Sequence, residues 1–175
     1  MTSHTPHERV PCADAIDLFI RKTGMIIAFT YVLLILVIML QVTLRKGFSS
    51  GLIALEELQW HLYAIGVMFG LAYAQVNNAH IRVDLFYGAF SARSKAWIGL
   101  FGLLFLVFPF IAVVFIHSLD FVYSAWQIGE RSDAPSGLPY RWLIKAVIPV
   151  SFLLLFLACL SRFIRDLTFL RRGTP

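Results

Sequence analysis

The sequence predicts an all-α integral membrane protein with four transmembrane helices, short amphipathic interfacial helices and both termini in the cytoplasm. Of its 175 residues, 59% are hydrophobic and only 14% are charged, whereas about 25% of the residues of an ordinary soluble domain are charged. The mean hydropathy of +0.76 leaves too little polar surface to cover a soluble domain. This composition excludes a soluble enzyme with a cleft, a disulfide-stapled secreted domain and a disordered chain.

Four windows of the chain are long and apolar enough to cross roughly 30 Å of hydrocarbon, which takes about 20 residues. The predicted spans are residues 24–44, 58–76, 96–119 and 142–161. The first contains no charge, and the only ionisable group of the third is His117. Gln59, His61 and Gln75 interrupt the second. The fourth carries Lys145 within one turn of its start, where its long stem is expected to reach the headgroups.

The distribution of basic residues predicts the orientation of these spans. In a four-span topology, 10 of the 15 Lys and Arg residues lie on the side of the two termini and 5 on the other side. Because positively charged loops stay in the cytoplasm, both termini are expected to be cytoplasmic. The tryptophans are expected at the headgroup level, close to the span ends: Trp60, Trp97, Trp126 and Trp142. Topology and anionic lipid then explain the basic pI, and no nucleic-acid partner is expected.

The chain is expected to form one membrane domain. Residues 1–9 are predicted to be disordered, residues 10–170 to form the four-helix domain, and residues 171–175 to form a basic tail. Apolar residues recur at helical spacing within 11–22 and predict an amphipathic helix on the inner leaflet, ahead of the first span. A second apolar stripe, in the inner connection 77–95, predicts an interfacial helix there.

A polar group of side chains opens the second predicted span: Glu56, Glu57, Trp60 and His61. Acidic residues interact favourably with the N-terminal end of a helix dipole, so the two glutamates are suited to a first turn. The same carboxylates, beside an indole and an imidazole, are also suited to hold a neighbouring membrane protein. The sequence leaves both interpretations open.

The connection 120–141 is polar, rich in turn residues and extracytoplasmic in this topology. Its charged residues Glu130, Arg131 and Arg141 make it the expected face for a soluble partner. Pro149 lies inside the fourth span, where it should free a backbone carbonyl and kink the helix.

Two other classes of small helical membrane protein place specific demands on the sequence. A haem- or quinone-associated anchor of a respiratory enzyme would need axial ligands, for which His61 and His117 are the candidates. A proton-coupled exporter would need a carboxylate within the membrane. No Asp or Glu lies in the interior of a predicted span, and no zinc-type Cys/His spacing or phosphate-binding loop is present.

Several short motifs, taken in order, resemble the small membrane subunit (DctQ type) of tripartite ATP-independent periplasmic (TRAP) transporters over about residues 18–166. The motifs are Glu56-Glu57-Leu58, His80-Ile81-Arg82-Val83-Asp84, Glu130 with Ser132, Leu138-Pro139, Trp142 and Ile148-Pro149. The sequences of residues 56–61 and 138–145 are most similar to those of the branch labelled for mannitol or chloroaromatic compounds.

The resemblance implies a scaffold subunit in the bacterial inner membrane rather than an enzyme. It implies two protein partners besides phospholipids: a large elevator-type permease that carries the sodium and substrate sites, and a periplasmic binding protein that delivers an organic acid. No cofactor or metal is then expected in this chain. The candidates for partner contacts are Glu56, Glu57, Trp60, His61, His80, Asp84, Glu130, Arg131, Arg141, Trp142 and Pro149.

Overall fold

The computed structural model describes residues 11–77 and 90–172, which form helices joined by turns and one longer loop. The elements are α1 (Pro11–Gly47), α2 (Ile53–Val76), α4 (Ala92–Gly102), the π-helical turn η1 (Leu103–Val107), α5 (Phe108–Gln127) and α6 (Arg141–Arg172). No strand occurs within the two described ranges.

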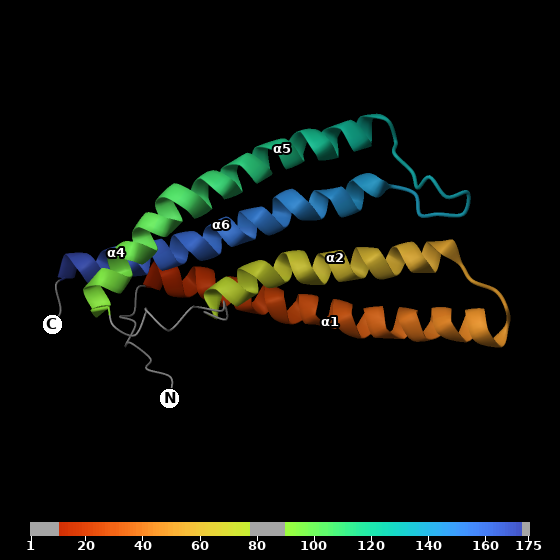
Figure 1. Ribbon diagram of the computed structural model, residues 1–175, viewed down its shortest axis with the longest axis horizontal. Coiled ribbons are helices and arrows are strands. Elements are labelled where there is room, and N and C mark those ends of the chain that lie inside the picture. Colours follow the sequence, from red (N-terminus) through yellow and green to blue (C-terminus); the bar gives the residue numbers. More distant parts are fainter. Residues whose placement is uncertain (1–10, 78–89, 173–175) are drawn as a thin grey trace.

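The long helices lie side by side in the order α1, α2, α6, α5, with α1 and α5 at the two edges (Figure 1). α1 and α2 run antiparallel, as do α6 and α5, whereas the middle neighbours α2 and α6 run parallel. The start of α1 and the end of α6 therefore lie at one end of the molecule, called here the terminal end. The turn between α1 and α2 and the loop 128–140 lie at the other end, called here the loop end.

Three stretches of the described residues are long and apolar enough to cross a membrane: Pro11–Gly47, Ala92–Gln127 and Arg141–Arg171. The prediction of an all-α membrane protein is confirmed. α2 is not among the three, because its polar residues lower its hydropathy. It nevertheless lies between α1 and α6 for 24 residues, about 36 Å of helix. A fourth crossing stays a prediction.

Reciprocal contacts between glycine and tyrosine bring α1 and α2 together. The ring of Tyr73 in α2 covers Gly24 in α1, and the ring of Tyr31 in α1 covers Gly66 in α2. A Cβ atom at either glycine would meet ring atoms. Small residues of this kind let two membrane helices approach closely, which strengthens their van der Waals contact.

α6 is the central helix, because both hydrophobic clusters of the fold are built on it. One cluster joins it to α1 and α2 and comprises Ile20, Ala72, Leu154 and Ala158. The other joins it to η1 and α5 and comprises Leu103, Ile111, Phe152 and Cys159. On α5 the buried residues Ile111, Ser118 and Ala125 recur every seven residues, so one narrow stripe of α5 faces α6.

The structure differs from the sequence prediction before the first span. No separate interfacial helix precedes it, since α1 runs without a break from Pro11 through residues 24–44. Ala13 and Ile20 are buried at 0% and 2% exposure, and Ile20 packs in the cluster with α6. Predicted disorder in residues 1–9 lies outside the described residues, as does most of the predicted inner interfacial helix.

The third apolar stretch is also longer than its predicted span. α4, η1 and α5 follow one another without a gap, and the helix continues past residue 119 to Gln127. Within η1 the helix widens: the Phe108 N–H donates to the Leu103 carbonyl, five residues earlier. Pro109 follows, lacks an N–H and crowds the carbonyl four residues before it, which is a sufficient reason for the wider turn.

Candidate partner-binding site

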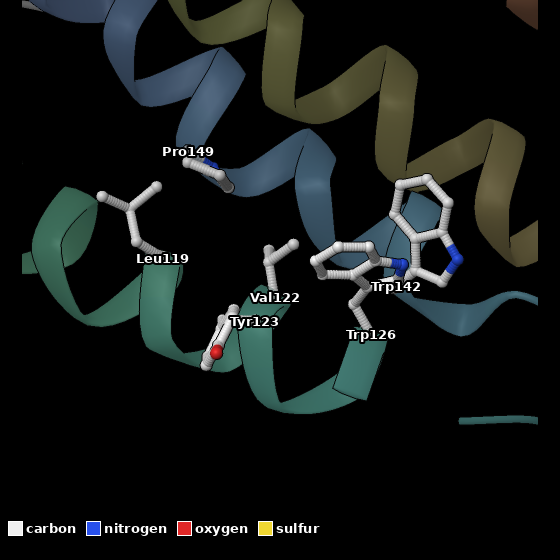
Figure 2. A pocket seen from close by; sticks show the side chains of 6 residues that line it. All are labelled: Leu119, Val122, Tyr123, Trp126, Trp142 and Pro149. Carbon is white, nitrogen blue, oxygen red and sulfur yellow. The ribbon is translucent and has the colours of Figure 1, made fainter. Parts of the chain in front are cut away.

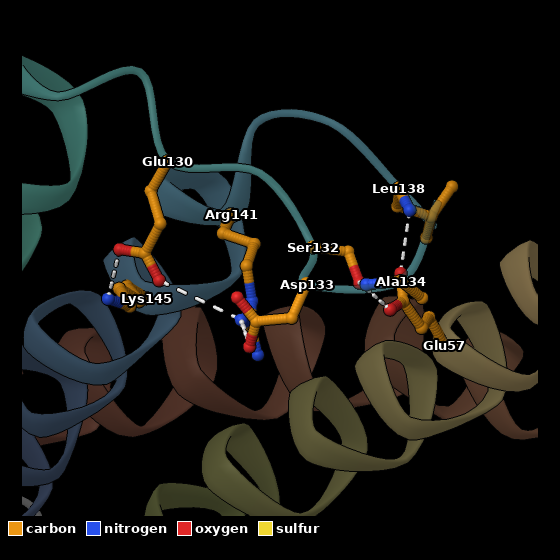
Figure 3. A network of polar contacts seen from close by, with 8 residues as sticks. All are labelled: Glu57, Glu130, Ser132, Asp133, Ala134, Leu138, Arg141 and Lys145. Atoms are coloured by element: carbon orange, nitrogen blue, oxygen red, sulfur yellow. Dashed lines mark hydrogen bonds and ion pairs between the residues drawn. The ribbon is translucent and has the colours of Figure 1, made fainter. Parts of the chain in front are cut away.

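Glu57 fastens the loop 128–140 to α2 (Figure 3). One carboxylate oxygen accepts a hydrogen bond from the Ser132 hydroxyl, and the other accepts from the Leu138 backbone N–H at 2.6 Å. Ser132 in turn accepts from the Ala134 N–H at 3.2 Å. The bonds from Ser132 and Leu138 stabilise the ionised carboxylate and hold the pKa of Glu57 below its ordinary value.

The same contact requires Gly137 in the loop. Its N–H donates to the Ala134 carbonyl at 3.0 Å, which closes a turn. A Cβ at this position would meet the Ser132 side chain and lie 2.8 Å from a carboxylate oxygen of Glu57. The loop therefore reaches Glu57 only because residue 137 lacks a side chain.

A second group of charges joins the two ends of the loop. Glu130 contacts Lys145 at 2.5 Å and Arg141 at 3.9 Å, and Arg141 also lies 3.7 Å from Asp133. The Lys145 ammonium lies 3.9 Å from the centroid of the Phe121 ring. Lys145 was expected to reach the headgroups, but it is largely buried and paired within the chain.

Glu56 makes weaker contacts than its neighbour. It accepts a hydrogen bond from the Gln41 amide at 3.3 Å and lies 3.5 Å from Arg45 in an exposed ion pair. Exposed pairs of this kind contribute little to stability. Both carboxylates of the motif thus contact residues of this same chain, a role that neither interpretation of the sequence had included.

Gln41 was missed by sequence reasoning. It is 5% exposed, it donates to the Leu52 carbonyl at 3.3 Å and it accepts from the Leu52 N–H at 3.4 Å. These bonds fix the turn between α1 and α2. The available signal was that Gln41 is the only amide in the uncharged window 24–44, because an amide in hydrocarbon needs partners.

Three further candidates lie on α2 or in the loop. Trp60 is 71% exposed and Arg131 is exposed. His61 is half-buried, one turn along α2 from Glu57, and the two side chains interact electrostatically. His80 and Asp84 lie outside the described residues.

Trp142 and Pro149 of α6 line an apolar groove against α5 (Figure 2). The groove has a volume of about 410 Å³, and its α5 wall comprises Leu119, Val122, Tyr123 and Trp126. Pro149 lies inside α6 as predicted. The kink that it should cause stays a prediction.

The two histidines considered as haem ligands are not brought together. His61 lies on α2 and His117 on α5, and α6 lies between these helices (Figure 1). The His117 side chain is exposed on its own helix. A shared axial ligation would require the two imidazoles to face one another.

A polar cluster at the terminal end was also missed. Arg165 of α6 contacts Asp14 at 2.7 Å and Asp17 at 2.6 Å, both on α1. The Ser161 hydroxyl lies 2.6 Å from the Asp17 carboxylate and 3.2 Å from the Ala13 carbonyl. From the sequence, both aspartates belong to the predicted amphipathic helix within residues 11–22, and no contact with the end of the chain was predicted for them.

The fold and these contacts define a small helical membrane protein in which several polar residues connect its own helices and loop. Residues 34–169 match the family described as tripartite ATP-independent periplasmic transporters, DctQ component, and the chain belongs to this family. No curated protein was found to match it. The family resemblance expected from the motifs is confirmed, and the family is a transporter component rather than a family of enzymes.

Membership places the chain in the inner membrane as the small subunit of a tripartite transporter. The other two components are a large permease and a periplasmic binding protein. The predicted kinds of partner are therefore supported. The mannitol or chloroaromatic branch stays a prediction.

Proposed function

We propose that this chain is the scaffold subunit that braces the large permease of a sodium-coupled TRAP transporter during uptake of an organic acid. The family match over residues 34–169 carries the proposal. An elevator-type permease slides its transport domain past a part that must stay fixed in the membrane. A row of four long helices tied at both ends suits that fixed part. Sodium and substrate would bind in the permease, and this chain would hold no cofactor.

The proposed topology has all four helices crossing the membrane, with the terminal end in the cytoplasm and the loop end in the periplasm. The excess of basic residues at the terminal end supports this orientation. The position of α2 in the same row as the three apolar stretches supports its crossing. A cysteine at exposed Ser136, in a Cys12→Ser background, should react with an impermeant maleimide from the periplasmic side. Reaction only after lysis would overturn the orientation.

The loop 128–140 is proposed to help dock the periplasmic binding protein. Its anchoring by Glu57 supports this role, because a loop already held in one conformation loses less entropy on binding. Arg131 and Asp133 are its exposed charges, whereas Glu130 is occupied by Lys145. Arg131→Glu should slow delivery from the binding protein while the membrane complex stays intact. Unaltered delivery would place docking on the permease alone.

Assembly is tested by purifying the tagged chain from its native membrane in mild detergent and identifying what accompanies it by mass spectrometry. Recovery of a large permease supports the scaffold function. Recovery of a dehydrogenase instead would favour the respiratory-anchor alternative and overturn the proposal. His80 and Asp84 are proposed as permease contacts on the strength of the family motif alone, and Asp84→Ala should lower permease recovery.

A further inference from the structure

The outward face of the loop-end half of α5 carries polar groups at a depth where a membrane helix facing lipid is expected to be apolar. Ile111, Ser118 and Ala125 face α6, and the opposite side of the loop-end half of α5 is exposed. That exposed side carries His117, Asp120, Tyr123, Ser124 and Gln127. The spacing of these residues, three or four apart, places them on one face of the helix.

Asp120 is the most informative member of this face. Its carboxylate makes no hydrogen bond or ion pair with any residue in the described ranges. The nearby Ser124 hydroxyl bonds to the Asp120 backbone carbonyl at 2.8 Å rather than to its side chain. Gln127 donates to the Tyr123 hydroxyl at 2.7 Å, so these two polar groups are satisfied locally. The carboxylate of Asp120 is left to interact with something outside the chain.

The depth of Asp120 follows from its distance to the interfacial tryptophans. Trp126 of α5 and Trp142 of α6 lie together at the loop end, where indole rings mark the headgroup level (Figure 2). Asp120 precedes Trp126 by six residues, so it lies about 9 Å deeper along the helix. His117 lies about 13 Å deeper by the same measure. Ionised groups at such depths are costly against lipid and are normally covered by protein or water.

The other edge of the layer has a different surface. The exposed side chains of α1 between residues 24 and 44 are mainly apolar, among them Phe29, Leu36 and Met39. The Thr43 hydroxyl donates a hydrogen bond to the Met39 carbonyl of its own helix at 2.8 Å, so its donor is satisfied within α1. The α1 edge is compatible with lipid, whereas the α5 edge is not.

We propose that the outward face of α5, around His117, Asp120 and Tyr123, packs against a transmembrane helix of the large permease that offers a lysine or arginine to Asp120. Charge complementarity selects this occupant, because a lone carboxylate at hydrocarbon depth requires a cationic donor. The adjoining groove of about 410 Å³ shares Tyr123 with this face and is suited to an apolar side chain of the same helix. The proposal rests on the scaffold function and names the surface through which it is exerted.

Photo-crosslinking in the complete transporter tests which edge contacts the permease. A photoreactive amino acid replaces Ile116 on α5 or, as a matched control, Leu36 on α1. Each site lies eleven residues before the loop-end terminus of its helix, and the two side chains are 59% and 61% exposed. Crosslinks to the permease from Ile116 and not from Leu36 support the proposal. Equal crosslinks, crosslinks only from Leu36, or crosslinks from Ile116 to a second copy of this chain overturn it.

Substitution tests the charge. Asp120→Lys should lower permease recovery about tenfold, and Asp120→Asn should lower it less, because an amide still accepts a hydrogen bond. Wild-type recovery with Asp120→Lys would overturn the role of the carboxylate. If Asp120→Lys does not accumulate, the crosslinking result in the otherwise unchanged chain decides. Wild-type chain that recovers no permease at all refutes the scaffold function itself, whereas recovery with crosslinks from α1 refutes only the choice of face.

Discussion

The two ends of the helix layer are tied in different ways. At the terminal end, Arg165 is 16% exposed and joins α6 directly to two carboxylates of α1. At the loop end, Glu57 of α2 holds a loop through Ser132 and Leu138, with no helix on the other side of the contact. The first tie therefore determines how helices pack, and the second determines where a loop lies. The comparison predicts that the stability of the fold depends on the terminal end and that loop order depends on the loop end.

The largest effect is expected from Arg165→Met. The substitution leaves Asp14 and Asp17 without their cation and should lower the free energy of unfolding by about 2–4 kcal/mol. Thermal unfolding in detergent measures it, with Arg171→Met, at an exposed position, as the control. If both variants unfold at the wild-type temperature, the terminal tie does not stabilise helix packing.

A smaller effect is expected when the two acidic partners of Arg165 are substituted one at a time. Asp17 is 18% exposed and contacts both Arg165 and Ser161, whereas Asp14 is 44% exposed and contacts only Arg165 among the described residues. Asp17→Asn should cost about 1–2 kcal/mol and Asp14→Asn less than about 1 kcal/mol in the same assay. The reverse order would show that burial does not control this cluster.

Glu57→Gln should change the loop and leave the helices unaffected. An amide cannot accept from both Ser132 and Leu138 as the carboxylate does, so cleavage of the loop by an added protease should become several times faster. The unfolding temperature should stay close to that of the wild type. Glu56→Gln is the matched control, because its carboxylate makes only weaker contacts. A large fall in unfolding temperature for Glu57→Gln would erase the contrast between the two ends.

The smallest effect is a dependence of loop order on acidic pH. The hydrogen bonds from Ser132 and Leu138 hold the folded-state pKa of Glu57 below its ordinary value of about 4.5. Its contribution is therefore fully present above about pH 4.5 and is lost as the pH falls through the lower folded-state value. A fluorophore on a Ser136→Cys variant, in a Cys12→Ser background, should report that the loop leaves Glu57 as the pH falls below about 4.5. Glu57→Gln should remove this dependence, and an unchanged profile in that variant would assign it to another group.

The sequence was sufficient for the helical class because long apolar windows depend only on local composition. The polar contacts at the two ends of the layer were not predictable in the same way. Glu57 and Leu138 are 81 positions apart in the sequence, and Asp14 and Arg165 are 151 positions apart. No local spacing relates residues at such separations. Asp120 shows a subtler limit. The third predicted span stops at residue 119 because Asp120, the next residue, is charged, and Asp120 was therefore assigned to the connection 120–141. The helix continues to Gln127, so Asp120 lies within α5.

The π turn η1 has a consequence for how the two halves of its long helix face their surroundings. A π turn holds one residue more than an α turn, and each α-helical residue advances the helix by about 100°. If Leu103–Val107 formed ordinary α-helix instead, the same number of residues would rotate Asp120 by about that angle relative to Trp97, with no change in the composition of either segment. The turn fixes the angular phase between the two halves, so it decides which neighbour the far half of the helix meets.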